Sequence, residues 1–174
     1  PCKVKAGSLA HQLYEKAETF REKAVIGIFY GCGLRRSEGE ALNIKDVSFK
    51  SSLLYVREGK GNKRRVIPIN QRVAGDIKNY IYYERFAQQN EIALITNNAG
   101  RRMRGDKLNN MVKELILKTE IKKEISLHNL RHSIATHLLE NGMTVEYVRD
   151  FLGHKHLEAT QIYTHVSKKR LSKL

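Results

Sequence analysis

The stretch AVIGIFYGCGLRRSE, residues 24–38, contains an apolar helical pattern that stops at two glycines and gives way to polar residues. Its apolar residues that share one helical face are Ala24, Val25, Ile28 and Phe29. Gly31 and Gly33 are typical of a helix end, because glycine readily adopts the backbone conformation found just after a last turn. Ser37 and Glu38 are typical of the first turn of a new helix. The stretch therefore predicts two helices joined by a tight turn.

A short β region follows this helix pair. Two apolar runs rich in β-branched residues, Leu53 to Val56 and Val66 to Ile69, flank a basic, Gly-rich segment at residues 57–65. Two such runs around a glycine turn predict a β-hairpin. Pro68 has no N–H to donate to a neighbouring strand, so we expect the second strand at the edge of its sheet.

Apolar residues at helical spacing predict four further helices. The four groups are Val73, Ile77, Tyr80, Ile81 and Ala87; Leu108, Met111, Val112 and Leu115; Leu130, Ile134 and Leu138; and Val145, Val148 and Leu152. We expect the third group to end at Asn141-Gly142 and the fourth at Gly153. The fold class expected from these patterns is α+β, mainly α with a small antiparallel β-sheet.

The composition favours a globular protein that binds an anion. The chain has 174 residues, enough for one domain, and 32 Lys and Arg against 18 Asp and Glu give it a formal charge of +14. No apolar run approaches the length of a membrane span, so we expect no membrane partner. Cys2 and Cys32 cannot staple a domain of this size, which favours the reducing cytoplasm. A solvated surface whose charge serves solubility stays an alternative reading of the composition.

The histidines raise the question of a zinc site, because six of the seven lie in the last 47 residues. His128 and His132 have the i, i+4 spacing that can place two ligands on one helical face. However, the chain has no H-E-x-x-H motif, no paired cysteines and no carboxylate at an obvious third-ligand position. We therefore expect no metal site.

Three places carry residues suited to phosphate chemistry. Arg35 lies beside a helix start, where backbone amides also attract anions, although the segment lacks the spacing of a nucleotide-binding loop. Lys60 and Lys63 lie on the hairpin tip, where a lysine can reach a leaving oxygen and donate a proton. His128 and Arg131 share one face at a helix start, so one phosphate can meet both. Structural or merely solvated roles stay open for each place.

Five motifs occur in a fixed order over residues 33–166. They are Gly33-Leu-Arg35-Arg-Ser-Glu38, Gly59-Lys60-Gly-Asn-Lys63, His128-x-x-Arg131, Leu152-Gly-His154, and Tyr163 in Gln-Ile-Tyr-Thr-His-Val. This series resembles the catalytic domain of tyrosine recombinases, the family of Xer-type chromosome resolvases and of phage and transposon integrases. One such motif alone is weak, but five in order make a specific pattern. The resemblance implies the fold that this family shares with type IB topoisomerases.

The resemblance also implies roles for four of these residues. Tyr163 is the expected nucleophile, which attacks a DNA phosphodiester and leaves a 3′-phosphotyrosyl link and a free 5′-hydroxyl. Arg35 and Arg131 are expected to hold the non-bridging oxygens, and His154 to hydrogen-bond the same phosphate. Two guanidiniums can stabilise the developing charge where other enzymes use Mg²⁺, so we expect no metal and no other cofactor.

Two further roles concern protons. By the same resemblance Lys60 protonates the leaving 5′-oxygen, with Lys63 as the alternative acid, and His128 assists proton transfer at the nucleophile. A phenol near its usual pKa of about 10 is a poor nucleophile at neutral pH, so cations and an imidazole nearby are needed. The energy of the broken bond is kept in the phosphotyrosine, so rejoining needs no ATP.

The remaining basic residues predict contacts with the DNA backbone. The expected contact residues are Arg36, Lys63, Arg64, Arg101, Arg102, Arg104 and Lys107. A basic surface suits a long polyanion, because each neutralised phosphate releases counterions. A solvated face without a partner is the alternative.

The expected organisation is a linker end at residues 1–7 and a catalytic domain at residues 8–174, without the N-terminal DNA-clamping domain of the family. The resemblance implies double-stranded DNA as the partner, and a tetrameric synapse with other protomers for a full-length protein. It implies a cytoplasmic protein that associates with the nucleoid. Two alternatives stay open, which are DNA relaxation of the type IB topoisomerase kind and a DNA-binding module without catalysis.

Overall fold

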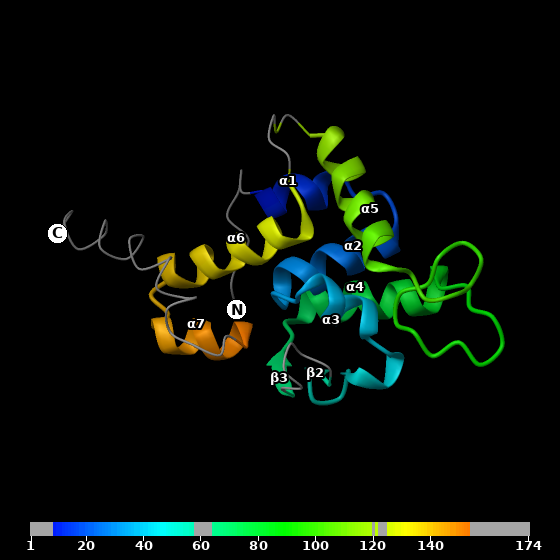
Figure 1. Ribbon diagram of the computed structural model, residues 1–174, viewed down its shortest axis with the longest axis horizontal. Helices are drawn as coiled ribbons and strands as arrows, with labels where there is room; N and C mark the ends of the chain where they lie inside the picture. Colours follow the sequence, from blue (N-terminus) through cyan, green and yellow to red (C-terminus); the bar gives the residue numbers. More distant parts are fainter. Residues whose placement is uncertain (1–8, 58–63, 120, 122–124, 154–174) are drawn as a thin grey trace.

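The computed structural model describes residues 9–57, 64–119, 121 and 125–153. Most of the elements are helices, and the small sheet lies along the lower side of the molecule in the view of Figure 1. In chain order the elements are α1 (Leu9–Lys16), α2 (Phe20–Ile26), a π-helical turn (Gly27–Gly31), α3 (Arg36–Ala41), a 3₁₀ turn (Ile44–Asp46), β1 (Val47–Ser48), β2 (Leu53–Val56), β3 (Arg65–Pro68), α4 (Gln71–Asn79), a second π-helical turn (Tyr80–Glu84), α5 (Gly105–Leu117), α6 (Leu127–Glu140) and α7 (Val145–Leu152).

Helix α2 forms the centre of the fold. It begins at a capping box in which Thr19 Oγ1 accepts from the Glu22 N–H at 3.1 Å and Glu22 Oε2 accepts from the Thr19 N–H at 2.9 Å. Its buried residues continue into the π-helical turn, so the predicted helix is confirmed with a wider last turn. The chain then reverses at Gly33 into α3, which confirms the predicted second helix.

The sheet has three antiparallel strands in the order β1-β2-β3. The predicted hairpin is confirmed, with Leu54 paired to Ile67 and Leu53 to Pro68. Pro68 lies on an edge strand, as expected. Strand β1, which has two residues, was not predicted from the sequence. The sheet fixes where the ends of the hairpin lie relative to α3.

The predicted helix after the sheet ends earlier than expected. Helix α4 and its π-helical turn stop at Glu84, so grouping Ala87 with this helix was wrong. Arg85 is extended, with ψ 104°, and its guanidinium donates to the carbonyls of Glu91 and Ala93. These bonds stabilise a loop in place of a further helical turn.

The three later helices are confirmed as α5, α6 and α7. Gly142 follows α6 with φ +86°, and Gly153 ends α7 with φ +65°, so both predicted glycine stops are confirmed. Helix α1 was not predicted. None of the helices in the described part of the chain has the length and apolar content of a membrane-spanning segment.

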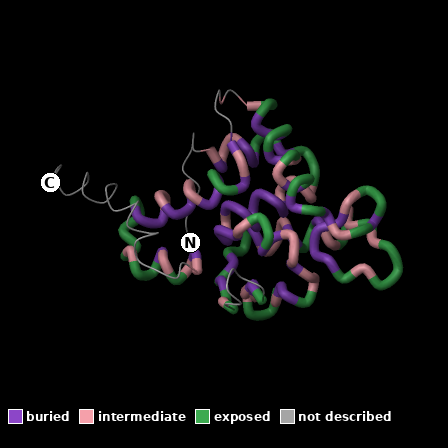
Figure 2. Tube along the Cα trace, viewed as in Figure 1, coloured by how far each residue is buried: buried purple, intermediate pink, exposed green. Residues whose placement is uncertain are grey.

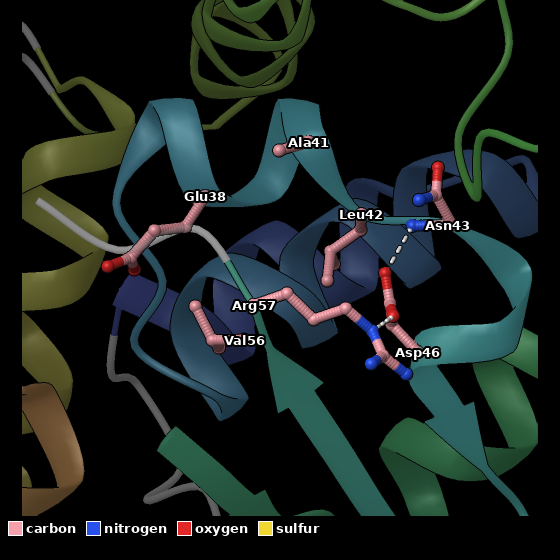
Figure 3. Close-up of a pocket in the computed structure, with 7 residues that line it drawn as sticks. All are labelled: Glu38, Ala41, Leu42, Asn43, Asp46, Val56 and Arg57. Carbon is pink, nitrogen blue, oxygen red and sulfur yellow. Dashed lines mark hydrogen bonds and ion pairs between the residues drawn. The ribbon is translucent and has the colours of Figure 1, made fainter. Parts of the chain in front are cut away.

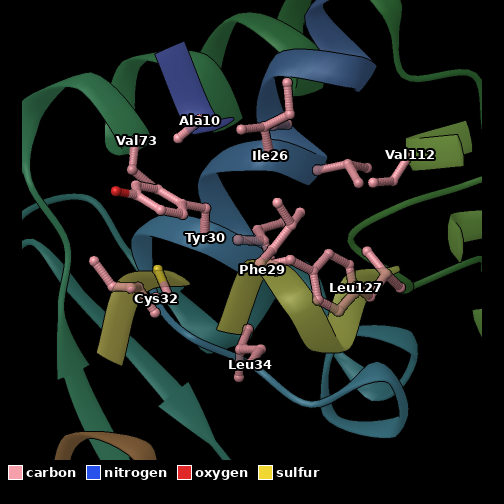
Figure 4. Packing of buried hydrophobic residues seen from close by; sticks show 14 of the residues in the cluster. Ala10, Ile26, Phe29, Tyr30, Cys32, Leu34, Val73, Val112 and Leu127 are labelled. Atoms are coloured by element: carbon pink, nitrogen blue, oxygen red, sulfur yellow. The ribbon is translucent and has the colours of Figure 1, made fainter. Parts of the chain in front are cut away.

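The core gathers around α2 and its π-helical turn. Buried residues follow these segments and much of α6 (Figure 2). Figure 4 shows Ile26, Phe29 and Tyr30 among labelled residues of α1, α4, α5 and α6, all of which belong to one buried cluster. Helix α6 packs on the π-helical turn that follows α2. The first two turns of α6 therefore lie beside the loop that leads into α3. The expected fold class, mainly α with a small antiparallel sheet, is confirmed.

Candidate active site

Arg35 is the residue just before the first residue of α3. Its backbone N–H donates to Glu38 Oε2 at 2.8 Å, and its Nη1 donates to Glu38 Oε1 at 2.8 Å. The backbone reaches this position through Gly33, whose φ of +61° is unfavourable for other residues. The Arg35 side chain is 26% exposed, so it is held by the protein and still reaches solvent.

Arg131 reaches the same place from the second turn of α6. Its Nη1 donates to the Gly33 carbonyl, and its Nη2 donates to the Leu152 carbonyl at 2.6 Å. Arg131 Nη1 also lies 4.0 Å from Glu38 Oε2. The structure thus brings together the two arginines that the sequence analysis selected from distant motifs.

Glu38 is the centre of this cluster, although its sequence pattern predicted no role for it in the site. Its side chain is fully buried. Arg65 donates to both carboxylate oxygens, at 2.8 Å from Nη1 and 2.9 Å from Nη2. Arg65, which the sequence analysis treated only as part of the basic turn, therefore links β3 to α3 through a bidentate ion pair.

The electrostatics of the cluster leave an excess of positive charge. Burial raises the pKa of Glu38, but the hydrogen bonds and charge of Arg65, together with bonds from Arg35, outweigh burial and hold that pKa at about 2. Glu38 is therefore a carboxylate at neutral pH. One carboxylate faces Arg35, Arg65 and Arg131, so the cluster is suited to an anion.

The C-terminal end of α7 completes the cluster. Three consecutive carbonyls accept from its three arginines: Phe151 from Arg65 Nε at 3.2 Å, Leu152 from Arg131 Nη2 at 2.6 Å, and Gly153 from Arg35 Nη2 at 3.1 Å. These carbonyls lack helical partners and carry the negative end of the helix dipole. The arginines thus fix the point at which the chain leaves α7, and residue 154 follows directly.

His128 and His132 form a pair on the first two turns of α6. Their Nε2 atoms lie 2.7 Å apart, and the rings are perpendicular with centroids at 4.3 Å. Burial lowers the pKa of His132, and the neighbouring His128 and Arg131 lower it further. Within the described ranges, no group of three or more His, Cys, Asp or Glu side chains is arranged to hold a metal ion.

Comparison with known proteins identifies the family. The pattern of the phage integrase family matches residues 6–170. The chain belongs to this family. It is 38% identical over 157 residues to tyrosine recombinase XerC of Chlamydia trachomatis serovar L2, and the match covers 89% of this chain and 50% of that protein. The chain spans about half the length of the curated relatives it matches.

Solved structures of relatives share the fold. The crystal structure of XerA recombinase matches with a TM-score of 0.87 at 29% identity, over 99% of this chain and 63% of that chain. XerH recombinase, solved as a post-cleavage complex with its palindromic difH substrate, matches with a TM-score of 0.80 at 23% identity, over 99% of this chain and 52% of that chain. Solved structures that share this fold thus include a complex with a DNA substrate.

Four of the predicted catalytic and DNA-contacting residues of this phage integrase family chain lie outside the described residues. They are Lys60, Lys63, His154 and Tyr163. Their roles stay predictions. Of the predicted catalytic residues, the structure therefore describes Arg35, His128 and Arg131, and it brings Arg35 and Arg131 to the same carboxylate.

Most of the predicted DNA contacts that the structure describes are at the surface. Arg36, Arg64, Arg104 and Lys107 are exposed, and Arg101 is exposed with its Nε 3.2 Å from Gln88 Oε1. Arg102 differs from them. Its guanidinium donates to the carbonyls of Glu40 and Leu42 and to Asn43 Oδ1, at 2.6, 3.1 and 2.6 Å. These bonds give Arg102 a structural role that its sequence neighbourhood did not indicate.

A small hollow near the cluster does not face the arginines. It lies between α3 and β2 and contains an ion pair from Arg57 to Asp46 (Figure 3). Asp46 also accepts from the Asn43 N–H at 2.9 Å. Glu38 borders the hollow, but its carboxylate points away from Arg57 in Figure 3. The hollow therefore marks the attachment of the hairpin base and is separate from the arginine cluster.

Proposed function

We propose that residues 8–174 are the catalytic domain of a site-specific DNA recombinase, which cuts and rejoins strands through a phosphotyrosine. The observation that carries this proposal is the convergence of Arg35 and Arg131 on Glu38 and on adjacent carbonyls of α7. Two guanidiniums held side by side match the two non-bridging oxygens of a phosphodiester. Family membership and the order of the motifs support the same function.

The main role of the proposed site is to stabilise the negative charge of the transition state. Attack on a phosphodiester places additional negative charge on the non-bridging oxygens in the transition state. Glu38 neutralises part of the charge of three arginines, and the excess is available to those oxygens. Because hydrogen bonds to Glu38 and to carbonyls hold the guanidiniums in place, little reorganisation is needed when the charge develops.

The covalent step uses residues outside the described ranges. The Tyr163 hydroxyl attacks the phosphorus, the bond to the 5′-oxygen breaks, and the 3′-phosphate stays on Tyr163. Lys60, or Lys63 in its place, protonates the leaving oxygen, and His128 assists the transfer of the phenol proton. His154 hydrogen-bonds the same phosphate, and the fixed Gly153 carbonyl just before it supports this placement. Rejoining reverses these steps.

The proposed substrate is double-stranded DNA at two sites, bound by four protomers of the full-length protein. The formal charge of +14 and the exposed Arg36, Arg64, Arg104 and Lys107 support binding of the backbone. The DNA complex of the relative XerH supports the substrate class. Such a substrate implies that the protein acts on the chromosome, in the cytoplasm, and associates with the nucleoid.

A nicked suicide duplex tests the proposed chemistry, because loss of a short fragment prevents rejoining. At low salt we expect the unmodified chain to form a covalent adduct and Tyr163→Phe to form none. Tyr147→Phe is the matched control, because Tyr147 is 47% exposed on α7 and lies outside the arginine cluster. We expect its adduct yield to equal that of the unmodified chain.

The same assay separates the alternatives. Junction products from two duplexes identify a recombinase, whereas relaxation of supercoiled DNA without junctions indicates activity of the topoisomerase kind. DNA binding without any adduct, from the full-length protein at low salt, would reduce the chain to a binding module and contradict the proposal.

A further inference from the structure

The histidine pair on α6 has a geometry that proton transfer alone does not require. His128 and His132 are one helical turn apart, and their Nε2 atoms share a hydrogen bond of 2.7 Å, in which one ring donates and the other accepts. The ring planes are perpendicular and their centroids are 4.3 Å apart, so the two Nε2 atoms lie close together on one face of α6. His128 is exposed and His132 is half-buried.

This arrangement is close to that of a chelating histidine pair. Bonds of about 2.0–2.1 Å from a tetrahedral Zn²⁺ place two imidazole nitrogens about 3.3 Å apart, so the rings need to separate by only about 0.6 Å. Histidines at i and i+4 on one helix provide two ligands in the same way in many zinc enzymes. Each neutral imidazole then carries its proton on Nδ1 and presents the lone pair of Nε2.

We propose that His128 and His132 chelate an exchangeable divalent transition-metal ion, with Zn²⁺ and Ni²⁺ as examples, and that the bound ion inhibits DNA cleavage. The inhibition rests on the proposed function of His128, because a metal on Nε2 occupies an atom of the imidazole that would move the proton. Binding itself does not depend on that function.

The surroundings make this an exchangeable site and not a cofactor site. In the described part of the chain no third His, Cys, Asp or Glu side chain joins the pair, so two protein ligands hold the proposed ion there. Arg131 lies next to the pair in sequence, and the positive end of the α6 dipole is near, so both disfavour a dication. Hard cations such as Mg²⁺ prefer oxygen ligands and have no reason to bind here.

Binding is tested on the unmodified chain by NMR of the histidine ring nitrogens. We expect stoichiometric Zn²⁺ to shift the Nε2 signals of His128 and His132 together, and Mg²⁺ to leave them unchanged. His132→Gln removes one ligand, and we expect at least about tenfold weaker binding at the remaining ring. His11→Gln is the control variant. His11 also lies on a helix, and Glu15, a potential ligand, lies one helical turn away from it. Unshifted signals for His128 and His132 at saturating Zn²⁺ would overturn the proposal.

Inhibition is tested with the suicide duplex, with each variant compared with its own metal-free rate. We expect Zn²⁺ to stop adduct formation by the unmodified chain and a chelator to restore it. His132→Gln should need at least about tenfold more Zn²⁺ for the same inhibition. If Zn²⁺ shifts both ring signals but cleavage continues, the inhibitory role is wrong. If no adduct forms under any condition while the rings still bind Zn²⁺, the proposed function fails and the metal site stands.

Discussion

Arg65 donates two hydrogen bonds to Glu38, at 2.8 and 2.9 Å, and thereby joins strand β3 to helix α3 across the candidate site. The same carboxylate accepts from the backbone and side chain of Arg35. Glu38 is thus a shared anchor for two segments that approach the cluster from different directions. Its burial means that no solvent can replace a lost partner.

Glu38→Gln tests this anchor. The neutral amide leaves the mostly buried Arg65 and the partly exposed Arg35 without their counter-charge, so we expect the free energy of unfolding to fall by about 3–5 kcal/mol in chemical denaturation. Asp106→Asn is the matched control, because Asp106 is exposed and its oxygen lies 3.9 Å from Arg104 Nε. We expect the control within about 0.5 kcal/mol of the unmodified chain. Equal losses in the two variants would show that Glu38 is no anchor.

The depressed pKa of Glu38 also predicts an acid limit to stability. A carboxyl group with a pKa near 4.5 unfolded and about 2 folded stabilises the native state fully above pH 4.5. That contribution, about 3 kcal/mol, is lost progressively as the pH falls from 4.5 towards 2. Denaturation curves recorded between pH 4.5 and 2 measure this loss of the free energy of unfolding. The Glu38→Gln variant should lack the part of the pH dependence that comes from Glu38. A variant curve parallel to that of the unmodified chain would exclude Glu38 as its source.

Gly33 combines a special backbone conformation with close packing, and the two effects can be separated. Gly33 has φ +61°, and an added Cβ would lie 2.9 Å from Leu152 Cδ2, a fully buried side chain. Gly142 has φ +86° with nothing within 4 Å. We expect Gly142→Ala to cost about 1–2 kcal/mol from backbone strain alone, and Gly33→Ala about 1–3 kcal/mol more from overpacking. Equal changes in the free energy of unfolding would contradict the packing of α7 against this turn.

Arg102 and Arg104 both belong to the basic surface predicted from the sequence, but we expect different effects when each is replaced. Loss of Arg102 should affect stability, and loss of Arg104 should affect DNA binding. Arg102 bonds two carbonyls and Asn43, so Arg102→Ala should lower the free energy of unfolding by about 1–3 kcal/mol. The Arg104 side chain is 82% exposed, so Arg104→Ala should leave stability unchanged. If Arg104 contacts a phosphate, its loss reduces the salt dependence of DNA binding by about one ion. An unchanged salt slope would remove Arg104 from the interface.

The sequence was sufficient to predict the main helices and the hairpin. Val148 and Leu152 recur at helical spacing before a glycine, and the structure ends α7 at Gly153 as expected. Local patterns of this kind decide structure because the apolar face and the stop lie within a few residues. The pairing of Leu54 with Ile67 follows in the same way from two apolar runs around a turn.

The features missed by sequence reasoning depend on contacts between distant segments. Strand β1 has two residues, too few for a period, and exists because Val47 pairs with Leu54. The role of Glu38 depends on Arg65, 27 residues away, and no local pattern separates a buried glutamate from an exposed one. Arg35 and Glu38 at i, i+3 were a usable hint, since this spacing also brings the Glu38 carboxylate to the Arg35 N–H.

The central claim is that Tyr163 takes the 3′-phosphate of a cut DNA strand at the site anchored by Arg35 and Arg131. The most direct measurement is a suicide duplex labelled separately at each strand end, followed by mass spectrometry of the digested adduct. We predict that only the strand segment ending in the 3′-phosphate is attached, that a single peptide containing Tyr163 carries it, and that the released segment has a free 5′-hydroxyl. Attachment through a 5′-phosphate, or at any other residue, would contradict the account.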